Sequence, residues 1–326
     1  MRVWLAWLGL AIAMALSGRA SPASSIDAMT LIIVVGAPGE PEYGSNFIHQ
    51  ASLWDTASQQ AGCAQITIGL DAVGATNDLD RLQLTLATQQ KTGTEALWLV
   101  LIGHGTFDGN EARFNLRGPD LSATDLALWL QPFQRPSVVI NTASASAPFL
   151  NRLSATNRVI VTATRSGYEQ NYARFGQFLA EAIASPQSDL DQDGQTSLLE
   201  AFLAASHRVV EFYQTEGRLA TEHALIDDNG DGLGTPADWF RGIRAIKKAA
   251  DGASLDGVRA HQFHLVRSAE EQRLPPAIRA QRDELELSIA RLRDTKLKIP
   301  EDEYYRKLET LLLDLGRLYE QTAPSR

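Results

Sequence analysis

The sequence predicts an α/β fold built on an open, mostly parallel β-sheet. Between residues 29 and 184, short uninterrupted apolar runs alternate with segments of helical pattern. Uninterrupted apolar runs indicate strands that are covered on both faces, and helices between them indicate parallel crossover connections. Ligands of such sheets bind at the carboxyl ends of the strands, so the residues that follow each strand are the first candidates for a functional site.

Five apolar runs are the expected strands, and they cover residues 30–35, 65–68, 97–102, 137–140 and 158–162. Helices are expected over about 45–60, 79–89 and 175–179. These elements place an α/β core at residues 24–186. After it, we expect a calcium-binding helical segment at 187–250, and then a linker and a C-terminal helical hairpin at 251–326.

Residues 1–23 have the layout of a secretory signal peptide. A basic start is followed by an almost wholly apolar stretch and then by small residues, with cleavage expected after Ala20 or Ala23. The apolar stretch is short for a membrane span, which needs about 20 residues. We therefore expect an exported protein, secreted or periplasmic, with no membrane span after signal removal; a retained membrane anchor is the alternative.

Composition narrows the possible partners and the means of stabilisation. The chain has 326 residues and a formal net charge of -9, which argues against binding to nucleic acid or anionic lipid. Cys63 is the single cysteine. Since one cysteine cannot form an internal disulfide, the fold must be held by its apolar core or by a metal ion.

Polar residues follow two neighbouring strands of the expected sheet. His104 stands between two glycines directly after the third strand, and Ser144 lies in the run of small residues that follows the fourth. Parallel neighbours would bring these ends together, and a base beside a nucleophile is the minimal arrangement for covalent catalysis. The alternative is a histidine at the rim of the sheet and serines that fill a crowded turn.

These segments resemble the caspase- and legumain-like cysteine peptidases. In that family one strand ends in His-Gly, and the next is followed by a short polar segment and the catalytic cysteine. Residues 161–166 and the helix at 175–179 fit the same order, so the resemblance covers about residues 30–184. It implies a catalytic role for His104. Gly105, Arg165 and Ser166 are the candidates for substrate binding, with Arg165 meeting an acidic substrate group; the alternative for Arg165 is an ion pair with a nearby Asp or Glu.

The chain departs from this family at the nucleophile. The segment after the fourth strand can be aligned with the family's cysteine motif in two registers. One places Ser144 at the cysteine position and the other places Ala143 there. Cys63, the single cysteine, is expected at the opposite end of the sheet. A serine hydroxyl ionises far less readily than a thiol and needs a base to take its proton during attack. We expect a catalytically degenerate homologue that binds a peptide or protein partner. The alternative is an active hydrolase, a peptidase that uses Ser144 as nucleophile and His104 as base.

Two acidic segments match the twelve-position EF-hand calcium loop, in which oxygen ligands at positions 1, 3, 5, 7 and 12 surround a glycine turn. In residues 189–200 these ligands are Asp189, Asp191, Asp193, Gln195 and Glu200. In residues 227–238 they are Asp227, Asn229, Asp231, Leu233 and Asp238. We expect structural Ca²⁺, less strongly in the second loop because Asp is shorter than Glu. Solvated acidic turns are the alternative.

The C-terminal segment has two apolar seams separated by Pro300. The first has Ile278, Leu285 and Leu292 at intervals of seven, and the second runs from Tyr304 to Leu318 in steps of three and four. This spacing predicts an antiparallel helical hairpin. The hairpin either packs only on its own core or mediates self-association.

Overall fold

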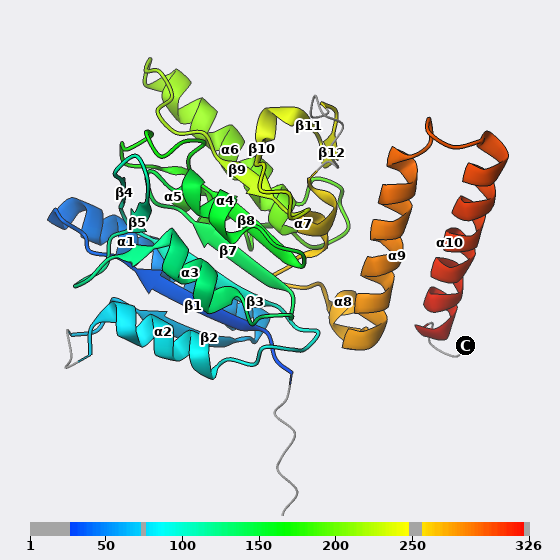
Figure 1. Ribbon diagram of the computed structural model, residues 1–326, viewed down its shortest axis with the longest axis horizontal. Helices are drawn as coiled ribbons and strands as arrows, with labels where there is room; N and C mark the ends of the chain where they lie inside the picture. The colour runs from blue at the N-terminus through cyan, green and yellow to red at the C-terminus, as the bar shows by residue number, and fades with distance from the viewer. Residues whose placement is uncertain (1–26, 73–75, 248–255, 323–326) are drawn as a thin grey trace, which may run out of the picture.

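The computed structural model describes residues 27–72, 76–247 and 256–322. The expected signal peptide lies outside the described residues. In the part of the chain that is described, no helix combines the length and apolarity needed to cross a membrane. Figure 1 shows a layered α/β core beside which a pair of C-terminal helices stands.

A seven-stranded sheet in the order β10-β9-β8-β7-β3-β1-β2 forms the centre of the core. Five of its strands pair in parallel. They are β1 (Thr30–Val35), β2 (Ala64–Ile68), β3 (Leu97–Ile102), β7 (Ser137–Asn141) and β8 (Arg158–Thr162). The predicted α/β class with a mostly parallel sheet is confirmed, and every predicted strand agrees within one residue at each end.

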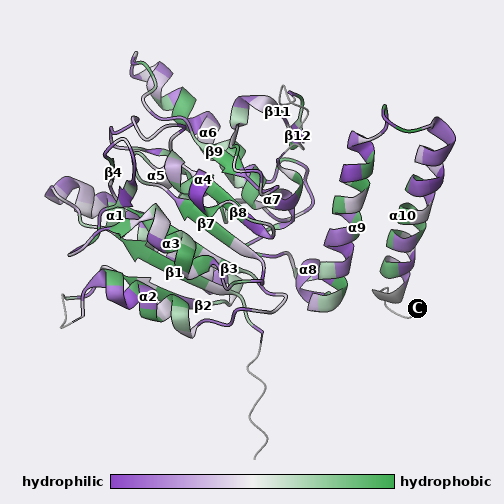
Figure 2. Ribbon diagram, viewed as in Figure 1, coloured by the Kyte–Doolittle hydropathy of each residue, from purple (hydrophilic) through white to green (hydrophobic). Residues whose placement is uncertain are grey.

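Helices cover both faces of this sheet, as its apolar strands require. On one face lie α1 (Pro41–Ala61), α5 (Phe175–Ala182) and α6 (Leu198–Thr215), and on the other lie α2 (Asp78–Thr88), α3 (Ala123–Leu130) and α4 (Ala147–Leu153). Because side chains alternate along a strand, Ile33 packs with the first set while Ile32 packs with the second. Figure 2 shows the central strands apolar along their length.

The sheet continues beyond β8 into the segment where only calcium loops and a helix were expected. Strand β9 (Leu225–Asp227) pairs antiparallel with β8, and β10 (Thr235–Pro236) pairs antiparallel with β9. Helix α6 from the same segment packs into the core. The described part of this segment, residues 187–247, therefore shares the hydrophobic core of the α/β unit. A strand of three residues, two of them apolar, is too short to show a strand pattern.

A second feature that the sequence did not reveal is a small antiparallel sheet between β3 and β7. It consists of β4 (Gly105–Phe107), β5 (Ala112–Phe114) and β6 (Leu121–Ser122). Phe114 is fully buried, and a Cβ added to Gly103 would lie 3.0 Å from its ring. Glycine at 103 thus leaves room for the Phe114 ring, so the small sheet packs over the end of β3, next to His104.

The short helix η1 (Pro186–Ser188) lies between α5 and α6. Other short elements lie between the core and the C-terminal helices, and they are η2 (Ala237–Trp239), β11 (Phe240–Arg241), β12 (Arg244–Ala245), α7 (Val258–Gln262) and α8 (Ala269–Arg273). The predicted hairpin is present as α9 (Pro276–Asp294) and α10 (Glu301–Thr322). Tyr304 and Leu318 of its second seam are buried, as is Leu292 of the first.

Candidate functional site

His104 lies at the carboxyl edge of β3, in a half-buried position among aromatic rings. Its Nε2 donates a hydrogen bond to the carbonyl oxygen of Pro38 at 3.2 Å. The rings of Tyr43 and Phe47, both from α1, lie edge-on at centroid distances of 4.8 and 5.1 Å. Burial lowers the pKa of the imidazole, and the bond to Pro38 only partly offsets this. The ring is therefore neutral at pH 7, with its lone pair on Nδ1.

Ser144 follows the neighbouring strand, β7, but its hydroxyl is engaged by backbone. The side chain is buried, its Oγ donates to the carbonyl oxygen of Gly105 at 3.1 Å, and it accepts from the Gly105 N–H at 3.3 Å. A Cβ on Gly105 would come within 2.2 Å of the Ser144 carbonyl oxygen, so this approach requires glycine. Among the described residues, no hydrogen bond joins His104 to Ser144.

The rest of the turn after β7 is packed with small side chains. Ala143 is 1% exposed and lies in the apolar cluster on the α4 side of the sheet, so in the other register a methyl group fills the nucleophile position. Ala145 has a φ of 52°, and its N–H donates to the carbonyl oxygen of Glu169 at 2.8 Å. The Oγ of Ser146 accepts from two backbone N–H groups after β8, at 3.1 and 3.2 Å.

The residues after β8 form a charged group beside this turn. Arg165 is exposed and pairs with Glu169 at 3.3 Å, while the Oγ of Ser166 accepts from the N–H of Tyr168 at 3.1 Å. Glu169 also binds His223, whose Nδ1 lies 2.6 Å from its Oε1. Our sequence analysis missed Glu169 and His223, because 54 residues separate them and neither belongs to a local motif.

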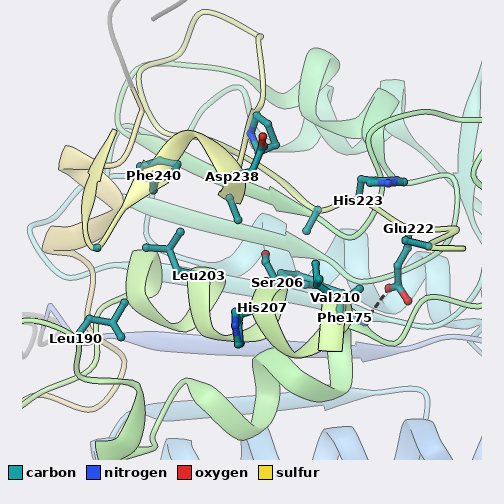
Figure 3. Close-up of a pocket in the computed structure, with 16 residues that line it drawn as sticks. Phe175, Leu190, Leu203, Ser206, His207, Val210, Glu222, His223, Asp238 and Phe240 are labelled. Atoms are coloured by element: carbon teal, nitrogen blue, oxygen red, sulfur yellow. Dashed lines mark hydrogen bonds between the residues drawn. The ribbon is translucent and has the colours of Figure 1, made fainter. Parts of the chain in front are cut away.

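An apolar cavity of about 510 Å³ opens next to His223 (Figure 3). Phe175 of α5, Leu203 and Val210 of α6, and Phe240 of β11 are among the residues that line it. The Oγ of Ser206, on the same wall, is buried without a hydrogen-bond partner. The cavity therefore suits an apolar group that brings a polar atom with it.

Glu222 also lines this cavity. Its carboxylate accepts from the backbone N–H groups of Arg174 and Phe175 at 2.8–2.9 Å, at the start of α5, and from the hydroxyl of Tyr213 at 3.2 Å. Burial raises the pKa of Glu222, and the backbone hydrogen bonds oppose that shift. This carboxylate thus satisfies N–H groups that the helix leaves unpaired at its start.

The first acidic loop gathers its carboxylates in the way that a calcium loop requires. Carboxyl oxygens of Asp189, Asp191 and Asp193 all lie within 4.8 Å of one another. Asp189 also accepts from the N–H groups of Asp193 and Gly194 at 3.2 and 2.9 Å, and Gly194 has a φ of 89°. Glycine is needed in this left-handed turn. The oxygen ligands fit a hard cation such as Ca²⁺.

The last residue of this loop, Glu200, is fully buried. Its Oε1 accepts from the N–H of Leu190 at 2.7 Å, and its Oε2 accepts from the N–H and Oγ of Ser197 at 2.8 and 2.7 Å. Ser197 and Glu200 form a capping box at the start of α6. Gln195 lies between the carboxylates and this helix, and its Oε1 accepts from the N–H of Ser268 at 3.1 Å.

The second acidic loop forms the same kind of turn. Asp227 is fully buried and accepts from the N–H groups of Gly230 and Gly232 at 3.0 and 3.2 Å. The turn continues with N–H bonds of 2.8 Å from Asp231 to Asn229 Oδ1 and from Leu233 to Asp231 Oδ1.

Asp238, the last predicted ligand of the second loop, points elsewhere. Its exposed carboxylate binds the Nζ of Lys247 at 2.6 Å. Within the described ranges, no group of three acidic or histidine side chains with ligand atoms inside 4.8 Å includes a residue of this loop. The structure thus brings together the carboxylates at positions 1, 3 and 5 of the first loop, but does not bring Asp238 to the others in the second.

Cys63 lies just before β2, at the opposite end of the sheet from His104. Its Sγ is half-buried and contacts the carbonyl oxygen of Ser58 at 3.8 Å. Burial raises the pKa of the thiol, which keeps it protonated and poorly nucleophilic at neutral pH.

No family model and no curated relative matches the chain. Among solved structures, it is similar to the Drosophila initiator caspase Dronc, with 12% identity and a TM-score of 0.40 over 70% of this chain and 95% of that chain. Caspase-1 from Spodoptera frugiperda matches with 10% identity and a TM-score of 0.42, over 62% and 87%. Protein GSU0716 from Geobacter sulfurreducens matches with 12% identity and a TM-score of 0.38, over 55% and 89%.

Proposed function

We propose that this chain is an exported, catalytically degenerate homologue of the caspase- and legumain-like peptidases that binds a peptide or protein partner. The observation that carries the proposal is that the side chains of His104 and Ser144 bond to backbone groups and not to each other. One side chain bonds to Pro38 and the other to Gly105, although the two residues follow neighbouring strands.

This arrangement lacks what a serine nucleophile needs. The hydroxyl proton of Ser144 already goes to the Gly105 carbonyl, and Ser144 is 3% exposed. For attack, the hydroxyl would have to leave both bonds with Gly105, and the imidazole would have to come within hydrogen-bond reach of it. The hydrolase that uses Ser144 and His104 remains the second candidate, because both lie at the same edge of the sheet.

The partner surface that we propose runs from this edge to the cavity of Figure 3. Ala145 bonds to Glu169, and Glu169 bonds to His223 at the cavity wall. A peptide laid along this path places an apolar side chain between Leu203 and Phe240. Burying apolar area there favours binding by about 25 cal/mol per Å² before the costs of association.

A fluorophosphonate probe, applied to the mature protein, tests the catalytic part of the proposal. We expect no labelling in the unchanged protein, in Ser144→Ala or in His104→Ala. Labelling that disappears in Ser144→Ala and falls about 10²–10⁴-fold in His104→Ala would establish the hydrolase instead.

Binding is tested with a library of immobilised peptides. We expect selected peptides to lose affinity for Val210→Glu, which places a charge on the cavity wall, and to keep it for Leu84→Glu. Leu84 is an exposed residue of α2 on the other face of the sheet. Equal binding by both variants would contradict the proposed surface.

We further propose that calcium stabilises the exported protein through the first acidic loop, where three carboxylates converge.

Export itself is tested by N-terminal sequencing of material from the periplasm or medium. The sequence should begin at Ser21 or Ser24. A protein that keeps Met1 and sediments with membranes would contradict export.

The hairpin supplies a proposed self-association surface. Leu312 and Leu313 of α10 are 49% and 53% exposed, whereas Tyr304 and Leu318 of its apolar seam are buried. Light scattering should show dimers that dissociate in a Leu312→Glu, Leu313→Glu variant and persist in Thr310→Ala. A monomer at every concentration would contradict this proposal.

A further inference from the structure

We infer that Asp191, Glu200 and His261 form a second metal site, of mixed oxygen and nitrogen ligands, that takes a divalent transition ion such as Zn²⁺. This site differs in chemistry from the proposed calcium site because it adds an imidazole, although both use Asp191 and Glu200.

The geometry brings the three ligands together from distant parts of the chain. One ligand atom from each residue lies within 4.8 Å of the others, and His261 Nε2 lies 3.0 Å from Asp191 Oδ2. Seventy residues separate His261 from Asp191. The side chains of His261 and Asp191 are 29% and 28% exposed, Asp191 as a whole residue is exposed, and Glu200 is fully buried.

The fold holds His261 in this place. Asp228 accepts from the N–H groups of Gly257 and Ala260 at 2.9 and 2.7 Å, which fixes α7. The carbonyl oxygen of Phe263 accepts from the N–H of Leu198 at 2.8 Å, which ties the end of α7 to the start of α6. His261, in α7, and Glu200, at the start of α6, are therefore held by two helix ends that are hydrogen-bonded to each other. Such preorganisation favours a metal site.

A second observation, at a neighbouring histidine, also points to a ligand. His264 is 7% exposed and its Nε2 has no hydrogen-bond partner in the structure. Its ring centroid lies 6.4 Å from that of His261, and both residues line one cavity with Asp193. A buried nitrogen left unpaired costs about 1–3 kcal/mol. An ion with its bound water supplies the partner that this nitrogen lacks.

The ligand chemistry selects the class of ion. Ca²⁺ is a hard cation that takes oxygen ligands, whereas imidazole suits Zn²⁺, Co²⁺, Ni²⁺ and Cu²⁺. Two carboxylates and one imidazole are three of the four ligands of a tetrahedral zinc site, and they leave one position for water.

The test is a titration of the mature protein, freed of metal with a chelator, with Zn²⁺ by calorimetry and with Co²⁺ by its visible absorption. We expect one ion per chain with tight binding. The affinity for Zn²⁺ should fall at least about tenfold in His261→Ala, because removing even a residue that only hydrogen-bonds to a metal ligand typically lowers metal affinity by that much. His207→Ala is the matched control, because that histidine is exposed on α6; its affinity should not change.

Asp191→Asn is the second variant, since Glu200 also caps α6 and its replacement could unfold the helix. We expect the same loss of Zn²⁺ affinity, with an unchanged circular dichroism spectrum. Equal Zn²⁺ affinity in His261→Ala and the unchanged protein would overturn the inference, as would an equal loss in His207→Ala. A calcium-dependent melting shift that persists in His261→Ala would separate this outcome from the calcium proposal.

Discussion

The hydroxyl of Ser144 and the backbone of Gly105 exchange two hydrogen bonds, of 3.1 and 3.3 Å, at the carboxyl edge of the sheet. The same edge holds His104, which bonds to Pro38 instead. Ser144 thus joins the start of β4 to the turn after β7, and its hydroxyl has a structural role that does not depend on catalysis.

Replacing this hydroxyl should therefore lower stability. In Ser144→Ala both buried backbone groups of Gly105 lose their partner, which costs about 1–3 kcal/mol. Ser45→Ala is the matched control, because Ser45 is exposed on α1 and substitutions there usually change stability by less than about 0.5 kcal/mol. Urea unfolding measures both. Equal stability of the two variants would show that the Gly105 bonds contribute nothing.

Calcium should raise the melting temperature. An ion at about 100 times its Kd stabilises the folded chain by roughly 2.7 kcal/mol, or about 5–10 °C for a protein of this size. Thermal melts in calcium and in chelator should differ by that amount, and Asp189→Asn with Asp193→Asn should remove the difference. Asp238→Asn, in the second loop, should retain it, because Asp238 binds Lys247. Identical melts in the unchanged protein would rule out a structural calcium.

Asp256 should make stability fall as the pH rises. Burial, together with the charge of Asp228, raises its pKa to about 8, whereas an unfolded aspartate has a pKa of about 3.9. Between these values the folded chain holds a proton that the unfolded chain has released, so this contribution is complete below about pH 4 and is lost as the pH approaches 8.

Asp256→Asn removes this proton while keeping the acceptor for the N–H groups of Asp228 and Asn229. Unfolding by urea in chelator, at pH 5 and pH 8, should show a smaller difference for the variant than for the unchanged protein. Asp55→Asn, on α1, is the control and should leave the difference unchanged. The same pH dependence in all three proteins would contradict the assignment.

Glu95 should anchor the hairpin to the core. Its buried carboxylate binds Arg267 at 2.7 Å and Arg279, the latter in α9, at 2.5 Å. Glu95→Gln leaves the buried Arg279 without a full counter-charge, and breaking a buried pair typically costs about 3–5 kcal/mol.

Hydrogen exchange should show faster exchange at the start of α9 in Glu95→Gln. Glu303→Gln removes an exposed pair with Lys307 on α10 and should change nothing measurable. Equal protection of α9 in both variants would mean that apolar packing alone holds the hairpin.

The sequence by itself determined the parallel strands and the C-terminal hairpin, because each depends on a local pattern. Apolar runs such as 97–102 and the seam from Tyr304 to Leu318 identify the buried side of an element without reference to its neighbours. The first acidic loop is equally local, since its carboxylates converge through turns between residues two to five apart. Its occupation by calcium stays a prediction.

Only the tertiary structure decided how side chains meet across the fold. Sequence order placed His104 and Ser144 at one edge, but the direction of each side chain depends on Pro38 and Gly105, and no periodicity encodes those contacts. Likewise, His223 meets Glu169, and His261 meets Asp191, across 54 and 70 residues. Contacts between distant segments arise from packing the whole core, so the chemistry that depends on them cannot be read from a local pattern.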